Sequence, residues 1–168
     1  MKKKFKHYDA VMEYAKSIVE GRKAACRELI QAAKRFLKDL ENPAYDFNPK
    51  EAEFVIQIIE KTFVHKQGEM LDGTPLLGKP FLLEDWQKFI VYNLLGFYHK
   101  GTQIRRFKEA FIYIPRKNGK TSFVAALAWA LALLERLSGS KIYITSAALQ
   151  QSLQSFEFIL FNLRQMGE

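Results

Sequence analysis

The stretch that decides the fold is EAFIYIPRKNGKTSFVAALAWALAL, which runs from Glu109 to Leu133. Residues 110–114 have strand character, a polar turn follows Pro115, and an Ala/Leu-rich run then continues without a helix breaker until Gly139. A strand, a turn ending in Gly-Lys-Thr and a helix together make the geometry of a phosphate-binding loop. Backbone N–H groups at such a helix start lack intrahelical acceptors, and the helix dipole favours an anion there.

This pattern predicts that Lys120 reaches the outer phosphates of a nucleotide and that the Thr121 hydroxyl ligates Mg²⁺. The usual loop, G-x-x-x-x-G-K-[ST], has a glycine where this chain has Ile114. Because the tripeptide alone is common by chance, the prediction depends on its context, which includes a second strand-like run, KIYITS, at 141–146. The alternative interpretation is a surface turn with a helix beginning at Thr121.

Composition sets broad limits on the 168-residue chain, which has the length of one domain, with or without a small helical appendage. With 48% hydrophobic and 14% aromatic residues it can build a core. The net charge of +8 fits a polyanionic partner or a soluble lysine-rich surface. The single cysteine, Cys26, excludes an internal disulfide, favours a reduced intracellular setting, and is expected to be a small core or groove residue.

Hydrophobic periodicity predicts helices elsewhere in the chain. A helical region covers 8–40, with a possible break at Gly21, and its other face is basic. The next helix has Asn48 as N-cap and ends near 65–68, and a Gly/Pro-rich connector with a short hairpin follows. Further helices are predicted at 84–99 and 149–166. The expected buried residues are Phe54, Val55, Ile58, Ile59 and Phe63 in the second helix, and Leu153, Phe156, Leu160 and Leu163 in the last.

The element order predicts an α/β fold: a partial parallel sheet of the P-loop NTPase type with an α-helical N-terminal region. The predicted domains are a helical region at 1–70 and an ATPase part at 71–168. The basic face of the first helical region is compatible with DNA binding and with an ordinary solvated surface. Its cations are Lys16, Arg22, Lys23, Arg27, Lys34, Arg35 and Lys38.

Three segments carry a resemblance to a known family: PRKNGKT at 115–121, FLLEDWQKFI at 81–90 and IYITSAALQQS at 142–152. Together they resemble the large terminase subunit of tailed bacteriophages, the ATP-driven motor that packages DNA into preformed capsids. The loop segment replaces the first glycine as this family does. The segment at 81–90 is similar to the family's adenine-recognition segment, where a glutamine follows an aromatic residue. The helical start at 14–40 also resembles this group.

The resemblance implies the following site. Lys120 and Thr121 bind phosphate and Mg²⁺, Gly119 and Asn118 supply backbone contacts, and Pro115, Lys117 and Ser122 complete the ATP-binding loop. Arg116 stabilises charge on the γ-phosphate, which makes it catalytic together with Lys120. Gln87 reads the adenine edge and Trp86 packs near the base. The alternatives are a solvated turn residue for Arg116, a surface helix residue for Gln87 and a core anchor for Trp86.

The resemblance also implies partners and a setting. The partners are double-stranded DNA, the terminase small subunit, the portal protein and further copies in a homo-oligomeric ring, with no membrane, in the cytoplasm of a bacterial host. An ATPase of this kind also needs an Asp, usually followed by Glu, after a later strand. Beyond Ser146 the only acidic residues of this sequence are Glu157 and Glu168. We therefore expect the N-terminal part of the ATPase domain, which alone binds nucleotide weakly and does not hydrolyse it.

Two other functions fit the sequence. One is a helicase-like or other P-loop ATPase fragment. The other is a non-catalytic nucleic-acid-binding or assembly module that uses the basic helix face with Arg105, Arg106 and Lys108. DNA binding that depends on salt but not on ATP would favour the non-catalytic module.

Overall fold

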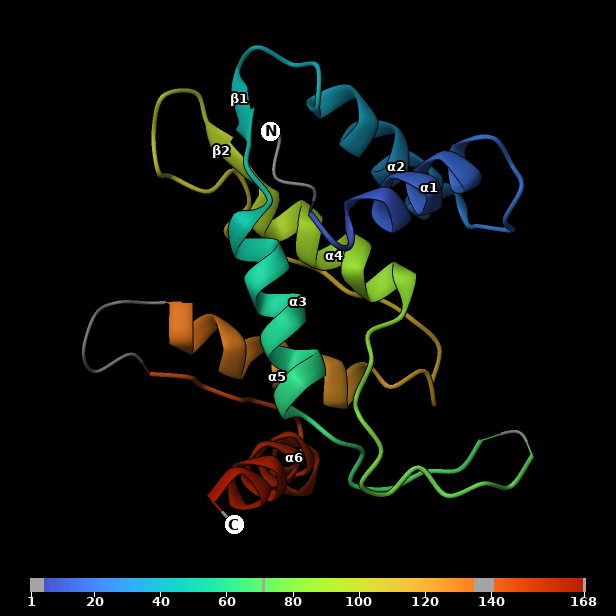
Figure 1. Cartoon of the computed structure of the whole chain (residues 1–168), viewed down its shortest axis with the longest axis vertical. Helices are drawn as coiled ribbons and strands as arrows, with labels where there is room; N and C mark the ends of the chain where they lie inside the picture. The colour runs from blue at the N-terminus through green and yellow to red at the C-terminus, as the bar shows by residue number, and fades with distance from the viewer. Residues whose placement is uncertain (1–4, 71, 135–140, 168) are drawn as a thin grey trace. The chain divides into compact units, whose positions relative to one another are not determined.

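The computed structural model describes residues 5–70, 72–134 and 141–167. Its elements form two compact units (Figure 1), each described by itself below. The first unit comprises Met1–Ile56 and Glu84–Phe111, and the second comprises Gln57–Leu83 and Ile112–Glu168. The predicted domains at 1–70 and 71–168 stay a prediction, because compactness alone does not define functional domains.

The first unit begins with the two helices that periodicity predicts. They are α1 (Tyr8–Val19) and α2 (Arg27–Asp39), and α1 packs against α2 and α4 (Figure 1). The break falls where expected, since Gly21 has a φ of +74°, a conformation that glycine adopts without steric cost. Cys26 precedes α2 and is exposed, so its predicted place in a core or groove is wrong.

A two-stranded antiparallel sheet in this unit was not predicted. Strand β1 (Tyr45–Phe47) pairs with β2 (Phe97–His99). The helix predicted at 84–99 is α4 (Asp85–Gly96), and it ends three residues early because 97–99 joins this ladder. Gly96 is required at the junction, since a Cβ there would lie 2.9 Å from Cε2 of Phe47.

Aromatic rings form the centre of the first unit. The Phe36 ring of α2 packs edge-on against Phe89 of α4, with 5.3 Å between centroids, and against Phe97 of β2 at 5.6 Å. Phe47 of β1 packs on Phe97 at 4.9 Å. Since Phe36 and Phe97 are fully buried, these contacts join both helices to the sheet.

Two buried carboxylates in the same unit are paired. The carboxylate of Glu53 accepts hydrogen bonds from the His7 backbone N–H at 2.8 Å and from the Tyr92 hydroxyl. Burial, with a smaller contribution from Glu53, raises the pKa of Tyr92 far above its usual value. Asp39, at the end of α2, forms an ion pair with Arg106, and both side chains are largely buried. Glu53 thus links α3 to α4 and to the residue before α1, and Asp39 links the end of α2 to the segment after β2.

Helix α3 (Lys50–Thr62) contributes its first half to one unit and its second half to the other. Asn48 caps it, because its Oδ1 accepts a bond of 3.4 Å from the Lys50 N–H. The helix ends at Thr62, earlier than the predicted 65–68. Of its predicted core residues, Phe54 is 46% exposed, which is a correction, and Ile58 is half-buried. The other three, Val55, Ile59 and Phe63, are buried as predicted.

The second unit is built from α5 (Lys120–Leu134) and α6 (Leu149–Gly167), which pack together, and from the segment that follows α3. Phe63 lies at its centre, with its ring 5.1 Å from Trp129 of α5 and 5.6 Å from Phe158 of α6. The predicted turn at Asp72-Gly73 is present, since Gly73 N–H donates to the Met70 carbonyl at 2.9 Å beside a Glu69–Pro75 bridge.

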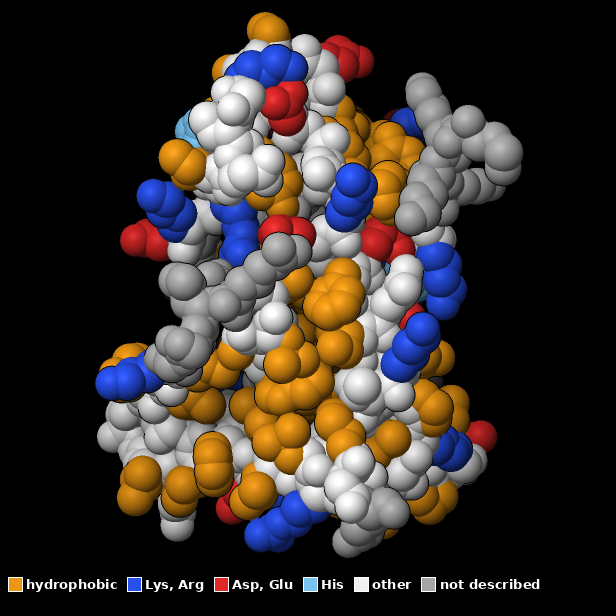
Figure 2. Space-filling view, turned by 60° about the vertical axis from the view of Figure 1, so that its left-hand side comes forward, with side chains coloured by type: hydrophobic (Ala, Val, Ile, Leu, Met, Phe, Trp, Pro, Cys, Tyr) orange, Lys and Arg blue, Asp and Glu red, His pale blue; other side chains and the backbone are white. Residues whose placement is uncertain are grey.

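The buried face of α6 differs from the predicted one. Phe158 and Asn162 are buried, while Leu153, Phe156 and Leu163 are exposed, and Leu160 is half-buried. The predicted periodicity is helical, but it marks the open side of the helix. Figure 2, which shows one face of the whole molecule, has hydrophobic side chains (orange) exposed on its surface.

The two predicted parallel strands are not part of the described structure. Residues 110–115 and 141–146 have no regular secondary structure, and Phe111 and Tyr113 are 93% and 87% exposed. A strand is stabilised by hydrogen bonds to a neighbouring strand. A sheet made only of residues 110–114 and 141–146 would be marginally stable. In the described residues the only named strands are β1 and β2, so this structure is helix-rich with a small antiparallel sheet.

Replacing Asp39 by alanine should destabilise the chain by about 3–5 kcal/mol, because it leaves the Arg106 guanidinium buried without its carboxylate. Urea unfolding followed by far-UV circular dichroism measures the loss. Glu13→Ala is the control, since it removes an exposed pair with Arg22 and should leave the unfolding midpoint unchanged. Equal midpoints for both variants would contradict the prediction.

Stability should fall as the pH is lowered from 7 to 5, in part through His65. Burial lowers the pKa of His65 below its usual 6.5, so the unfolded chain binds the proton first and acid favours unfolding. The contribution of neutral His65 to the free energy of unfolding is fully present above pH 6.5 and is lost as the pH falls below that value. Thermal midpoints at pH 7, 6 and 5 should show a smaller fall for His65→Gln. The control, Lys61→Gln at an exposed position, removes a group that stays charged over this pH range and should keep the wild-type fall.

Candidate functional site

The predicted phosphate loop is an exposed turn that leads directly into α5. Arg116 and Lys117 form the turn, and α5 begins at Lys120. The Asn118 side chain holds the turn closed, because its Nδ2 donates to the carbonyls of Pro115 at 3.3 Å and Arg116 at 3.2 Å. The structure therefore has a turn followed by a helix at the predicted positions, whereas residues 110–114 form no strand.

Two loop residues have left-handed backbone conformations: Lys117 with φ of +67° and Gly119 with φ of +66°. Glycine adopts this conformation freely, but a lysine does so at a cost of about 1–2 kcal/mol. Lys117 is the one non-glycine residue with positive φ among those that the structure describes. Alternation of right- and left-handed residues turns successive N–H groups toward one side, which is the geometry of an anion-binding nest.

The start of α5 has the electrostatics that a phosphate group needs. The first intrahelical bond runs from the Phe123 N–H to the Gly119 carbonyl at 3.0 Å. The N–H groups of Lys120, Thr121 and Ser122 precede it and have no acceptor within the helix. The first turn carries no acidic residue, and Lys120 is exposed. The open N–H groups, the helix dipole and the lysine fit a phosphate group.

A metal site is less developed. Thr121 is exposed at the helix start, where its hydroxyl could serve as one oxygen ligand of a Mg²⁺ ion held by phosphates. Within residues 5–70, 72–134 and 141–167 no group of three or more His, Cys, Asp or Glu side chains is placed to hold a metal. The loop residues fit a metal that arrives with a nucleotide rather than one held by the protein alone.

Trp86 and Gln87 lie in the first turn of α4, in the first unit, whereas the loop belongs to the second unit. Gln87 is buried and is part of a capping box: its Oε1 accepts a 2.8 Å hydrogen bond from the Glu84 N–H, and the Glu84 side chain accepts from the Gln87 N–H. The alternative interpretation of Gln87 as a surface helix residue is therefore wrong. Trp86 is half-buried, and both base-recognition roles stay predictions.

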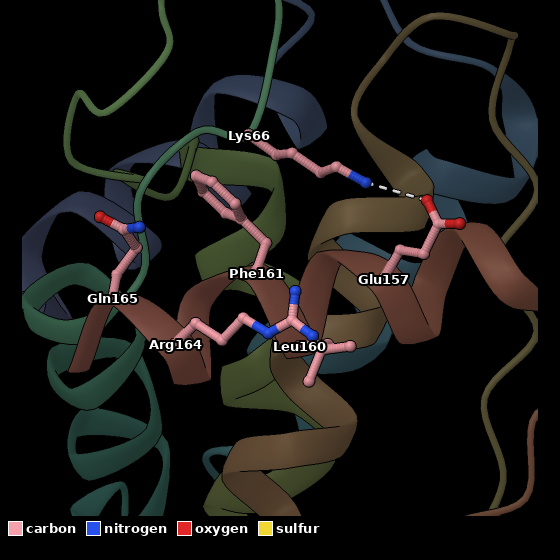
Figure 3. A pocket seen from close by; sticks show the side chains of 6 residues that line it. All are labelled: Lys66, Glu157, Leu160, Phe161, Arg164 and Gln165. Atoms are coloured by element: carbon pink, nitrogen blue, oxygen red, sulfur yellow. Dashed lines mark hydrogen bonds and ion pairs between the residues drawn. The ribbon is translucent and has the colours of Figure 1, made fainter. Parts of the chain in front are cut away.

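Sequence reasoning missed a pocket of about 350 Å³ on α6 (Figure 3). On one side Lys66 forms an ion pair of 2.9 Å with Glu157. The lining residues, none of them from the loop, are Lys66, Glu157, Leu160, Phe161, Arg164 and Gln165. Lys66 is far in sequence from the others and the set carries no motif, so the sequence held no signal for the pocket.

Sequence reasoning also missed Asn162, which holds α6 in place. Its Oδ1 accepts a 2.7 Å bond from the Val64 N–H, and its Nδ2 donates to the Phe158 carbonyl at 3.0 Å. A single amide in the otherwise apolar run FILFNL, at 158–163, was a signal that could have marked it.

One known protein family matches part of the chain. Residues 85–165 match the model of the terminase large subunit, ATPase domain. This part of the chain, just under half of the 168 residues, is similar to that family. The match includes Trp86, Gln87 and the loop up to Ser122, and confirms the resemblance drawn from the three sequence segments. No curated protein and no solved structure matched the chain.

This similarity supports a component of a DNA-packaging motor. The matched residues include α4, β2, the loop and α5, and end within α6. Helices α1 and α2 lie outside the match. Among the described residues no helix is long and apolar enough to cross a membrane.

The strained residue of the loop gives a test of its geometry. Lys117→Gly should raise the free energy of unfolding by up to about 1 kcal/mol, because relief of the left-handed strain exceeds the entropy that glycine adds to the unfolded chain. Arg116→Gly, at a neighbouring turn position without positive φ, should lower it. Thermal unfolding of both variants measures the difference, and the same sign for both would show that Lys117 is not strained.

Proposed function

We propose that the chain is the ATP-binding part of a phage DNA-packaging motor. In the intact protein, ATP binding and hydrolysis drive translocation of double-stranded DNA into the capsid. The observation that carries this proposal is the coincidence of the terminase ATPase match at 85–165 with an open, cationic helix start at 119–122. The proposed partners are DNA, the terminase small subunit, the portal protein and further copies in a ring, in the host cytoplasm.

In this proposal the loop holds the phosphates of ATP. The N–H groups of Gly119 to Ser122 surround the terminal phosphates, Lys120 neutralises their charge, and the Thr121 hydroxyl binds the accompanying Mg²⁺. Asn118 keeps the turn closed through its bonds to two loop carbonyls. ATP supplies the phosphoanhydride bond whose hydrolysis powers the motor.

Arg116 is the proposed catalytic partner of Lys120. It lies in the turn, is exposed, and belongs to a loop that Pro115 and Asn118 shape. A guanidinium at this position stabilises the charge that develops on the γ-phosphate when the bond breaks. Trp86 and Gln87 are proposed to contact the adenine base; their place within the matched residues supports this.

Removal of the loop lysine tests nucleotide binding. Lys120→Ala should weaken binding of a fluorescent ATP analogue in the presence of Mg²⁺ by tenfold or more, since it removes a charge-assisted contact of roughly 1.5–3 kcal/mol. Lys61→Ala is the control, because it removes the same charge at an exposed position of α3. Equal affinity for both variants and the wild type would overturn the proposal.

The expectation that this chain alone does not hydrolyse ATP stays a prediction. Phosphate release from the 168-residue protein, with Lys120→Ala as the background, decides it. Turnover above that background would overturn this expectation and leave the binding proposal intact.

A further inference from the structure

The exposed face of α2 is entirely polar. Its exposed positions are Arg27, Glu28, Gln31, Lys34, Arg35 and Lys38. The apolar residues Ala33 and Phe36 face the core of the first unit and are fully buried. A helix that presents cations outward without any exposed apolar residue is suited to a highly charged partner and offers no hydrophobic anchor.

Three of these cations are not neutralised. Arg27 pairs with the adjacent Glu28 at 3.1 Å, and on the preceding segment Arg22 pairs with Glu13 and Glu20. Lys34, Arg35 and Lys38 form no ion pair in the part of the chain that the structure describes. The far half of α2 therefore carries a concentrated positive charge that no described carboxylate cancels.

Arg35 is held in place by an aromatic ring rather than by a carboxylate. Its guanidinium carbon lies 4.9 Å from the centroid of the Phe107 ring, which also contacts Arg106 at 4.7 Å. Arg106 is neutralised by buried Asp39, so its charge does not reach the surface. Stacking leaves the N–H groups of Arg35 available while it restricts their position.

We propose that this surface, made of Lys34, Arg35 and Lys38, binds the phosphate backbone of double-stranded DNA. Lys34 and Lys38 lie four residues apart on α2, so they are about 6 Å apart along the helix axis and can each contact a different phosphate. An anionic membrane is disfavoured because the apolar side of α2 is buried and cannot insert. A protein interface is disfavoured because this face has no apolar centre.

The surface lies outside the nucleotide loop, and its three α2 residues precede the matched range of 85–165, so the family match does not assign it. Contacts to phosphate alone carry no base information. Binding by this surface is therefore independent of DNA sequence and ATP, and strongly dependent on salt. Such binding favours the non-catalytic module over the ATPase only if Lys120→Ala also leaves nucleotide binding unchanged.

The test measures binding of a labelled duplex of arbitrary sequence, about 30 base pairs long, to the 168-residue protein by fluorescence anisotropy between 50 and 200 mM salt. A variant with Lys34→Gln, Arg35→Gln and Lys38→Gln should bind at least tenfold more weakly at 50 mM salt. The plot of log affinity against log salt concentration should become shallower, with the magnitude of its slope smaller by about 2–3. Each lost phosphate contact contributes about 0.9 to that magnitude. The replaced residues are exposed, so the unfolding midpoint should not change.

The matched control removes the same charge elsewhere, by Lys16→Gln, Lys50→Gln and Lys61→Gln at exposed positions. It should change the affinity less than twofold. Equal weakening in the two triple variants, or none in the α2 variant, would overturn the proposal. So would wild-type binding to phosphatidylserine vesicles that exceeds binding to the duplex.

Two single variants separate this proposal from others. Phe107→Leu keeps every charge but removes the ring that positions Arg35, and it should weaken duplex binding two- to fivefold. Lys120→Ala should bind the duplex like the wild type, so failure of the nucleotide site and failure of the α2 surface give different results. If Phe107→Leu binds the duplex as tightly as the wild type, the ring does not position Arg35 for binding.

Discussion

Packing of Phe63 against Trp129 and Phe158 is the interaction on which the second unit depends. It brings the end of α3 into contact with both α5 and α6, and the hydrogen bond from Val64 to Asn162 fixes α6 beside it. Because the loop continues directly into α5, the position of this helix start depends on the aromatic cluster. The proposed phosphate site on an exposed turn would thus depend on buried rings remote in sequence.

In the first unit the comparable constraint is the ring of Phe36 with the buried pair of Asp39 and Arg106. Ala33, Phe36 and Asp39 of α2 face inward at helical spacing, and the cations between them necessarily face outward. The pair also brings Phe107 close to α2, where the ring orients Arg35. Core packing and the surface charge of α2 are therefore two consequences of the same helix orientation.

The helices were predictable because their periodicity is local, and the Asn48 cap and the Gly21 break were readable for the same reason. The sheet was not. Its strands are three residues each, and they pair although they are far apart in sequence, with Tyr45 opposite His99. The buried face of α6 was also misassigned: Leu153 and Phe156 are as apolar as Phe158, and only the position of Phe63 decides which side is covered.

By itself the sequence determined the helices, the turn with its Gly-Lys-Thr ending and the family of residues 85–165, because each of these depends on neighbouring residues in the chain. The tertiary structure decided what long-range contacts control. These are the ladder of β1 and β2, the burial of Gln87, the left-handed Lys117 and the α2 cations that no described carboxylate cancels. The physical reason is that burial and charge pairing are properties of a fold, which local sequence patterns do not contain.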